Sequence, residues 1–213
     1  MTTQFINFDP GASMRTVDEA ARRAKRTELL DAAARCFAER GYHATRTADI
    51  CALAGMSSGN LFHYFPTKQA VLLALIERDG TETASAVAEL GASDDPFGAL
   101  LLLLDDVCRL AADSTYSGLA LEISALAHRD DDVAVLFKAN DLSFRKALED
   151  LLERADDAGQ LDTDLTAEDA STWIAALVDG MFARVAADPD FQPETQSAVL
   201  RRIVTQLLRG AAS

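Results

Sequence analysis

The chain has 213 residues, 49% of them hydrophobic and 25% charged, with only 11 glycines and 5 prolines, which excludes a disordered or collagen-like protein. Its net charge of −14 is unevenly distributed, because residues 1–68 carry nine basic and seven acidic side chains, whereas residues 69–213 carry eleven and twenty-seven. Only the first third of the chain therefore suits a polyphosphate partner, and the acidic remainder is expected to face away from it.

The first part of the chain predicts a tail and two helices. Residues 1–20 show no periodic pattern and predict a flexible tail. Apolar residues then recur at three- and four-residue steps over residues 22–40, which predicts a helix that ends at Gly41, since glycine can adopt the left-handed C-cap conformation. The segment Thr45-Arg46-Thr47 offers N-cap hydroxyls for a short second helix, which breaks at Gly55.

The third predicted helix is also short, and the fourth is long. Ser57 is a good N-cap for a helix that ends before Pro66, because the residue preceding a proline disfavours the α region. Thr67 then caps a helix that runs towards Leu90 with apolar residues at helical spacing.

The remaining chain divides at polar breaks into helical stretches of roughly 15 to 27 residues, and no segment alternates with period two. We therefore predict an all-α fold of about nine helices. A helix-turn-helix domain is expected over residues 21–66, and a helical ligand-sensing and dimerisation domain over residues 67–213.

Two short helices joined at a glycine indicate a helix-turn-helix. The second of them must begin with small polar residues, because base edges come within reach at that end. The residues that meet this requirement are Ser57, Ser58, Gly59 and Asn60. Asn60 is the best base-reading candidate, because its amide can both donate to and accept from an adenine edge. The side chains expected at phosphates are His63, Tyr64 and Lys68. Each of these residues alone is more typical of a cap or a core, so the prediction depends on their joint arrangement.

Residues 26–76 closely resemble the DNA-binding domain of the tetracycline-repressor family. The resemblance is carried by LLDAAARCFAERGY, by the segment from Thr45 to Ile50, by Ala54-Gly55-Met56-Ser57 and by LFHYFPTK. Phe62 departs from the family, which commonly has tyrosine there, so this ring either packs or touches a thymine methyl group. The segments Trp173 to Phe182 and Asp188 to Phe191 look like the C-terminal domain of a betaine-regulator-like branch of the same family.

The resemblance implies a homodimeric repressor of transcription that binds a palindromic operator in double-stranded DNA and is released by a small-molecule effector. The DNA-facing residues that it implies are Arg46, Thr47, Ser57, Ser58, Gly59, Asn60, Phe62, His63, Tyr64 and Lys68. The two helix-turn-helix domains of such a dimer, its DNA-binding heads, would read half-sites about one helical turn, ~34–36 Å, apart.

A cytoplasmic protein without a membrane span is expected. The N-terminus lacks the basic start and apolar stretch of a signal peptide. The longest apolar run, Phe97 to Leu104, is far below the ~20 residues of a spanning helix. Cys36, Cys51 and Cys108 are odd in number and form no CxxC pair, which favours buried, reduced thiols over redox sensors.

A dimer interface is predicted at the C-terminal end. The helices expected over residues 167–187 and 194–209 are apolar on more than one face, so one face is expected in the core and another on a second subunit. A thick intramolecular core is the alternative. The interface candidates are Ile174, Leu177, Val178, Gly180, Val199, Leu200, Ile203, Val204 and Leu207.

A cavity for an apolar or amphipathic effector is expected within the predicted fourth to eighth helices. The candidate lining residues are Phe97, Leu104, Cys108, Tyr116, Glu122, Phe137, Phe144, Trp173 and Met181. Glu122 and Asp179 interrupt apolar stretches, and a buried carboxylate needs a partner. Each of them therefore faces a cationic group, pairs with an arginine or faces solvent.

Two other classes of protein compete with a regulator. An enzyme is disfavoured, because none of the three histidines has metalloprotease spacing and no nucleophile elbow, phosphate-binding loop or dinucleotide-binding glycine pattern occurs. The run from His128 to Asp132 is more typical of a solvated turn than of a metal site, and no metal or cofactor is expected. The second alternative is a helical dimeric adaptor, or a regulator without ligand control, but the charge distribution and the polar residues 57–60 argue against an adaptor.

Overall fold

The structure, a computed structural model, describes residues 10–210, and over that range it contains nine helices and no strand. This confirms the predicted all-α fold. The helices are α1 (Pro10–Arg40), α2 (Thr47–Leu53), α3 (Ser58–Tyr64), α4 (Lys68–Gly91), α5 (Pro96–Ala112), α6 (Ser114–Ala127), α7 (Asp131–Asp157), α8 (Ala167–Ala187) and α9 (Pro193–Arg209). None of the described helices is both long and apolar enough to cross a membrane.

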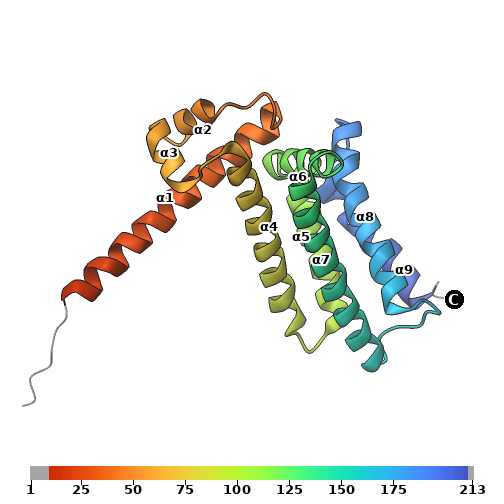
Figure 1. Ribbon diagram of the computed structural model, residues 1–213. Helices are drawn as coiled ribbons and strands as arrows, with labels where there is room; N and C mark the ends of the chain where they lie inside the picture. Colours follow the sequence, from red (N-terminus) through yellow and green to blue (C-terminus); the bar gives the residue numbers. More distant parts are fainter. Residues whose placement is uncertain (1–9, 211–213) are drawn as a thin grey trace, which may run out of the picture.

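The expected tail over residues 1–20 needs a correction. Residues 1–9 lie outside the described part of the chain, but α1 begins at Pro10, well before the start that the apolar period predicts. Residues 19–28 are exposed, so this part of α1 buries no apolar face whose period could reveal it. Figure 1 shows the N-terminal half of α1 extending past the rest of the molecule.

A first hydrophobic core joins the helix-turn-helix to the body of the molecule, which is formed by α4 to α9. Its fully buried side chains include Phe37 of α1, Ile50 of α2 and Leu61 of α3. The same cluster takes in Leu72 of α4 and Ile123 of α6, so apolar contacts continue past residue 66 without a gap. A displacement of α4 or α6 must therefore reach the helix-turn-helix through close-packed side chains.

The turns before α2 and α3 depend on glycine and on side-chain caps. Gly41 and Gly55 have φ angles of +76° and +63°, the left-handed region that favours glycine. Thr45 does not cap α2 as predicted, because its hydroxyl donates to the carbonyls of Cys36 (3.0 Å) and Gly41 (2.8 Å) and so closes the end of α1. Arg46 is the N-cap residue of α2 instead, and its backbone N–H donates to the Asp49 carboxylate at 2.9 Å.

The body of the molecule has a second core, built by α5, α7, α8 and α9. Leu104, Leu148, Ile174 and Val204 are all fully buried in it. In Figure 1 these helices stand side by side as a bundle, and α4 connects the bundle to α2 and α3. The packing between α6 and α1 is tight at Gly118, where an added Cβ would lie 3.1 Å from the Cβ of Ala38.

The three cysteines are buried and unpaired within the described residues, as expected. Burial raises the pKa of the Cys36 and Cys108 thiols, and this disfavours the reactive thiolate. The structure therefore gives no support to the redox-sensing alternative.

Candidate DNA-binding surface and effector cavity

The start of α3 presents small polar groups to solvent. Ser57, Ser58, Gly59 and Asn60 are all exposed. Ser57 caps the helix as predicted, because its Oγ accepts a hydrogen bond from the backbone N–H of Asn60 at 3.4 Å. No side-chain hydrogen bond within the described residues holds the Asn60 amide, so its donor and acceptor are available to a base edge.

The other side of α3 is anchored to the domain. Leu61 is 0% exposed and Phe65 only 3%. The Arg26 guanidinium lies 5.1 Å from the centroid of the Phe65 ring and closes this contact from α1. The helix is therefore fixed in orientation while its polar end remains exposed to solvent, as a recognition helix requires.

The aromatic residues of α3 lie on its open side. The Phe62 side chain is 50% exposed, so it is not part of the core and remains available to a thymine methyl group. His63 is exposed and Tyr64 half-buried, and their rings meet edge to face with centroids 5.5 Å apart. At the start of α2, Arg46 is exposed and Thr47 partly so. Nine of the ten predicted DNA-facing residues thus lie at the starts of α2 and α3 or along α3.

Lys68 occupies a different kind of place. Its ammonium group donates to the carbonyls of Tyr42 (2.7 Å) and Thr45 (2.9 Å) and lies 4.3 Å from the centroid of the Tyr42 ring. A phosphate contact would require these hydrogen bonds to break, so Lys68 joins α4 to the loop before α2 instead. Burial lowers the pKa of this lysine.

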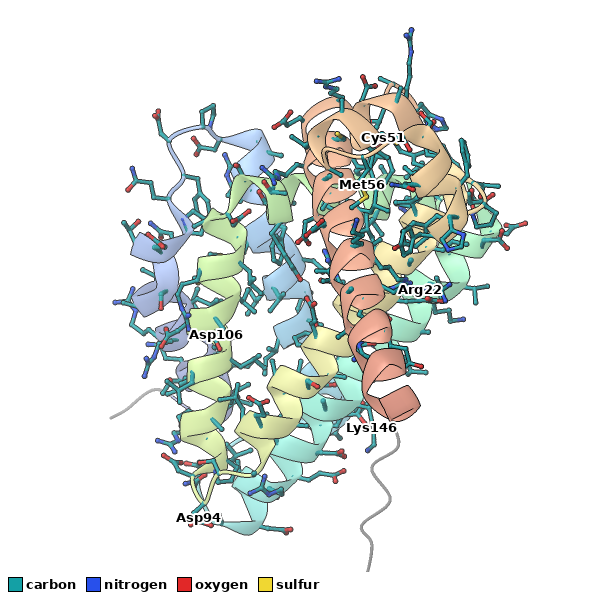
Figure 2. All side chains as sticks on the ribbon, turned by 90° about the vertical axis from the view of Figure 1, so that its left-hand side faces the viewer. Arg22, Cys51, Met56, Asp94, Asp106 and Lys146 are labelled. Atoms are coloured by element: carbon teal, nitrogen blue, oxygen red, sulfur yellow. The ribbon has the colours of Figure 1, made fainter. Side chains whose placement is uncertain are left out.

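Four basic side chains of α1 were not among the residues predicted to face DNA. Arg22, Arg23, Lys25 and Arg26 are all exposed on the stretch of α1 that precedes its buried face. Figure 2 shows Arg22 on this stretch, between the helix-turn-helix and the N-terminal end of the helix. The available signal was four basic residues among five positions, in the only third of the chain that has a positive balance.

The body contains a cavity of about 270 Å³ between α4, α5, α6, α7 and α8. Its walls are largely apolar, and the aromatic residues that line it are Tyr116, Phe137, Phe144 and Phe182. The rings of Tyr116 and Phe182 are in contact, with centroids 5.8 Å apart.

Three of the nine predicted lining residues, Tyr116, Phe137 and Phe144, do line this cavity. Four others, Phe97, Leu104, Cys108 and Met181, are buried in the core of the body instead. Trp173 is 62% exposed on the surface of α8. These five differ from the prediction because an apolar helix position can face the core, a cavity or solvent, and periodicity does not separate the three.

Glu122 lies outside the cavity and holds the loop before α2. Its Oε1 accepts a hydrogen bond from the backbone N–H of Tyr42 at 2.6 Å. The carbonyl of the same Tyr42 accepts from Lys68, so one peptide segment is tied to both α6 and α4. Neither of the partners considered for Glu122, a ligand cation or an arginine, is the one that it has.

The cavity walls carry several aspartates. Asp79 accepts a hydrogen bond from the Tyr116 hydroxyl at 2.8 Å, and burial raises the pKa of both groups. Asp179 lies on the α8 wall, where burial and the nearby charge of Asp141 raise its pKa. Gly80 permits the close approach of α4 and α7, because an added Cβ would lie 2.2 Å from the side-chain oxygen of Asn140.

The predicted dimer residues divide between two faces. Ile174, Val178, Leu200 and Val204 are buried within the body, and Val178 also lines the cavity. The residues that remain exposed or half-exposed are Leu177, Gly180, Val199, Ile203 and Leu207. Trp173 extends this outer face along α8, and Figure 1 shows α8 and α9 on the flank away from α2 and α3.

The run from His128 to Asp132 forms a helix boundary. Asp130 is the N-cap of α7, and its carboxylate accepts from the backbone N–H of Val133 at 3.1 Å. Within the described residues, no three histidine, cysteine or acidic side chains group as metal ligands.

Two family models match the chain. Residues 29–75 match the bacterial regulatory proteins of the tetR family, and residues 98–209 match the C-terminal domain of BetI-type transcriptional repressors. The first match covers the helix-turn-helix, and the second covers α5 to α9. The chain is 31% identical over 198 residues to the HTH-type transcriptional repressor Rv1474c of Mycobacterium tuberculosis, an alignment that spans 92% of this chain and 100% of that protein.

Solved structures share the fold over most of the chain. GusR of Salmonella enterica superposes with a TM-score of 0.71 at 27% identity, over 87% of this chain and 95% of its own. FadR of Bacillus subtilis, solved in complex with stearoyl-CoA, superposes with a TM-score of 0.73 at 20% identity, over 87% of this chain and 99% of its own. The exposed polar start of α3, the two family matches and the full-length relative lead to one conclusion: the chain belongs to the tetR family of bacterial regulatory proteins and is a helix-turn-helix repressor of transcription.

Proposed function

We propose that the protein reads a palindromic operator as a homodimer and leaves it when a small molecule fills the cavity of the body. The observation that carries the DNA-reading part is the division of α3, whose Leu61 and Phe65 are anchored while Ser57 to Asn60 are exposed. Base contacts are assigned to Ser58 and Asn60, with Gly59 allowing close approach of the backbone. An enzymatic activity is not part of the proposal.

Phosphate contacts are assigned to α3 and to the start of α2. His63 and Tyr64 contact phosphates from α3. Arg46 and Thr47 contact them from the start of α2, where backbone N–H groups also favour an anion. We add the basic side chains of α1, because they are exposed and carry positive charge in a chain whose remainder is strongly acidic. Lys68 is left out of the set, since its ammonium group is bound to backbone carbonyls.

The dimer is assigned to the outer face of α8 and α9. Trp173, Val199 and Ile203 are 62%, 39% and 43% exposed, and large apolar side chains gathered on adjacent helices favour burial against a partner. Two such helices from each subunit would form a four-helix bundle about a two-fold axis. Each single head makes few contacts, so linking two heads supplies the affinity that one lacks.

Effector control is proposed to act through α4 and α6. Both helices line the cavity, with Asp79 on one and Tyr116 on the other, and both hold the Tyr42 segment through Lys68 and Glu122. A ligand that prefers one separation of these helices therefore biases the position of α2 and α3. Only a difference in affinity between the two arrangements can drive this shift. FadR, a regulator of the same fold, was solved in complex with stearoyl-CoA, which supports the proposal that this fold can bind a small molecule.

The DNA-reading proposal is tested with an operator selected from random duplex DNA by the full-length protein. We expect enrichment of a palindrome, and we expect Asn60→Ala to weaken its binding by about 1–3 kcal/mol at fixed salt, the loss typical of a base contact. The control is Gln192→Ala, which removes an exposed amide from the loop before α9. If no sequence is enriched at low salt, the chain is an adaptor without DNA-reading function.

A further inference from the structure

The charged side chains that line the cavity of the body are all acidic. Its walls carry one aspartate from each of four helices, and no lysine, arginine or histidine lines it. The four carboxylates are Asp79, Asp106, Asp141 and Asp179. The rest of the lining is mainly apolar and aromatic, so an apolar ligand body would find good contacts there.

Two of these carboxylates already have basic partners. Asp106 forms an ion pair with Arg109, one turn further along α5. Asp141 forms one with Arg145 on α7, with 3.1 Å between Nε and the carboxylate oxygen. Each of these two carboxylates therefore already has a cationic partner within the protein.

The other two carboxylates have no ion pair within the described residues. Asp79 is bonded only to the neutral Tyr116 hydroxyl at 2.8 Å. The neighbouring Arg78 is directed elsewhere, because its guanidinium pairs with Asp31 of α1 (2.7 Å) and with Glu82 (3.8 Å). Asp179 lines the cavity from α8 and is also exposed to solvent.

Removing an unpaired carboxylate from water costs free energy, and this desolvation raises the pKa of the half-buried Asp79 and, together with the Asp141 charge, that of the more exposed Asp179. A positive charge brought by a ligand would remove this cost. The rings of Tyr116 and Phe182 add to the attraction, since a cation is stabilised at the face of an aromatic ring. A carboxylate or phosphate ligand would meet like charges and no basic side chain on the walls.

We propose that the effector is an amphipathic organic cation, whose ammonium group pairs with Asp79, with Asp179 as the second negative charge, and whose apolar body packs against Phe137 and Phe144. This inference rests on the proposed function only in taking the ligand of the cavity to be the effector. At about 270 Å³ the cavity suits a small ligand, because it falls near the lower end of ligand pockets.

The experiment compares three probes that share one apolar body: 4-phenylbutylamine, 4-phenylbutanol and 4-phenylbutanoate. Their binding to the full-length protein without DNA is measured by titration calorimetry at pH 7. We expect the amine to bind roughly tenfold more tightly than the alcohol, as a charge-assisted pair predicts, and the acid to bind most weakly.

Asp79→Asn and Asp179→Asn are then expected to bring the affinity for the amine down towards that for the alcohol, without changing the affinity for the alcohol itself. Asp94→Asn serves as the matched control, because Asp94 is exposed in the loop before α5, at the end of the body away from Met56 and Cys51 (Figure 2). Circular dichroism verifies that each variant is folded, and Asp179→Asn alone decides the matter if Asp79→Asn does not fold.

Equal affinity for the three probes, no binding of the amine, or an amine preference that survives both substitutions would overturn the proposal. Operator binding by the same preparations is measured separately. A carboxylate-dependent preference for the amine without any release of operator DNA would keep the ligand assignment and reject effector control. Release of the operator by the alcohol and the acid as readily as by the amine would keep effector control and reject the cation.

Discussion

Tyr42 is the residue at which the cavity helices and the DNA-reading helices meet. Its backbone N–H donates to Glu122 of α6, its carbonyl accepts from Lys68 of α4, and its ring lies beneath the same ammonium group. It directly follows Gly41, whose positive φ turns the chain out of α1. The Tyr42 segment is thus hydrogen-bonded to two of the helices that line the cavity, α4 and α6.

Removing the Glu122 carboxylate should loosen this connection. We expect Glu122→Ala to lower the free energy of unfolding by about 1.5–3 kcal/mol, the range for a hydrogen bond to a charged group, and to weaken the release of operator by ligand. Denaturant unfolding and operator titrations with and without 4-phenylbutylamine measure the two effects. Glu153→Ala, an exposed position on α7, should change neither. Unaltered stability and release in Glu122→Ala would show that the hydrogen bond does not couple the sites.

Asp79 should make stability depend on pH. Burial raises its pKa in the folded protein, against the opposing effects of the Tyr116 hydrogen bond and the Arg78 charge. A raised folded pKa means that the contribution of this group to stability is present below its unfolded pKa and is lost as pH rises through the folded value. Asp79→Asn should therefore raise the thermal midpoint at pH 8 and raise it less at pH 5. Thermal unfolding at the two pH values measures this, and an equal change at both would contradict it.

The two unpaired aspartates of the cavity differ in how far the sequence could predict them. Asp179 is recognisable because it interrupts an apolar stretch, whereas Asp79 follows Glu77 and Arg78 in a charged run that is typical of a solvated face. Which arc of a helix borders a cavity depends on how neighbouring helices pack, and no local pattern encodes that. The exposed polar start of α3 could be predicted, because a cap, a glycine turn and a proline fix the helix locally.

Among the elements, α1 differs most from its prediction. Its C-terminal half is amphipathic and could be predicted from its period, but its residues 19–28 are exposed and bury no apolar face, so only the structure shows that the helix begins at Pro10. Such a stretch buries little surface, and its basic residues suit a partner of opposite charge. The short helices α2 and α3 lie where the sequence predicts, because local turn chemistry determines both.

The basic stretch of α1 should contribute to DNA affinity without contributing to sequence preference. We expect the triple substitution Arg22→Gln, Arg23→Gln, Lys25→Gln to weaken binding to operator and to random DNA alike, and to reduce the salt slope by about one for each phosphate that the variant no longer neutralises. Arg26 is kept, since it packs on the Phe65 ring. Fluorescence anisotropy over a salt series measures the slope, and Lys138→Gln on α7 is the control. An unchanged slope would exclude phosphate binding by this stretch.

The uneven charge of the chain would orient the proposed dimer on DNA. Residues 69–213 have a strongly acidic balance, so repulsion keeps the body away from the phosphate backbone and leaves the heads as the surface that approaches DNA. A dimer through α8 and α9 would join the two bodies on the flank away from α2 and α3, which is consistent with this separation (Figure 1).

Charge placed on the outer face of α9 should separate the subunits. We expect Ile203→Glu to give monomers and to weaken operator binding at least tenfold, because the advantage of two linked heads is lost. Sedimentation equilibrium at micromolar concentration measures the change in mass. Val135→Glu provides the control, since Val135 is also an exposed apolar residue (68%), but lies on α7. Dimers that persist in Ile203→Glu would place the interface elsewhere.

The close contact of Gly118 with Ala38 limits how α6 can respond to a ligand. A helix whose backbone touches its neighbour, as α6 touches α1 at Gly118, cannot slide freely past it, so rotation about the contact is the easier motion. Tyr116, Ala120 and Ile123 line the cavity on both sides of this contact, and Glu122, between the last two, holds the Tyr42 segment. A ligand that rotates α6 about this contact would therefore move Glu122 and, through its hydrogen bond, the Tyr42 segment.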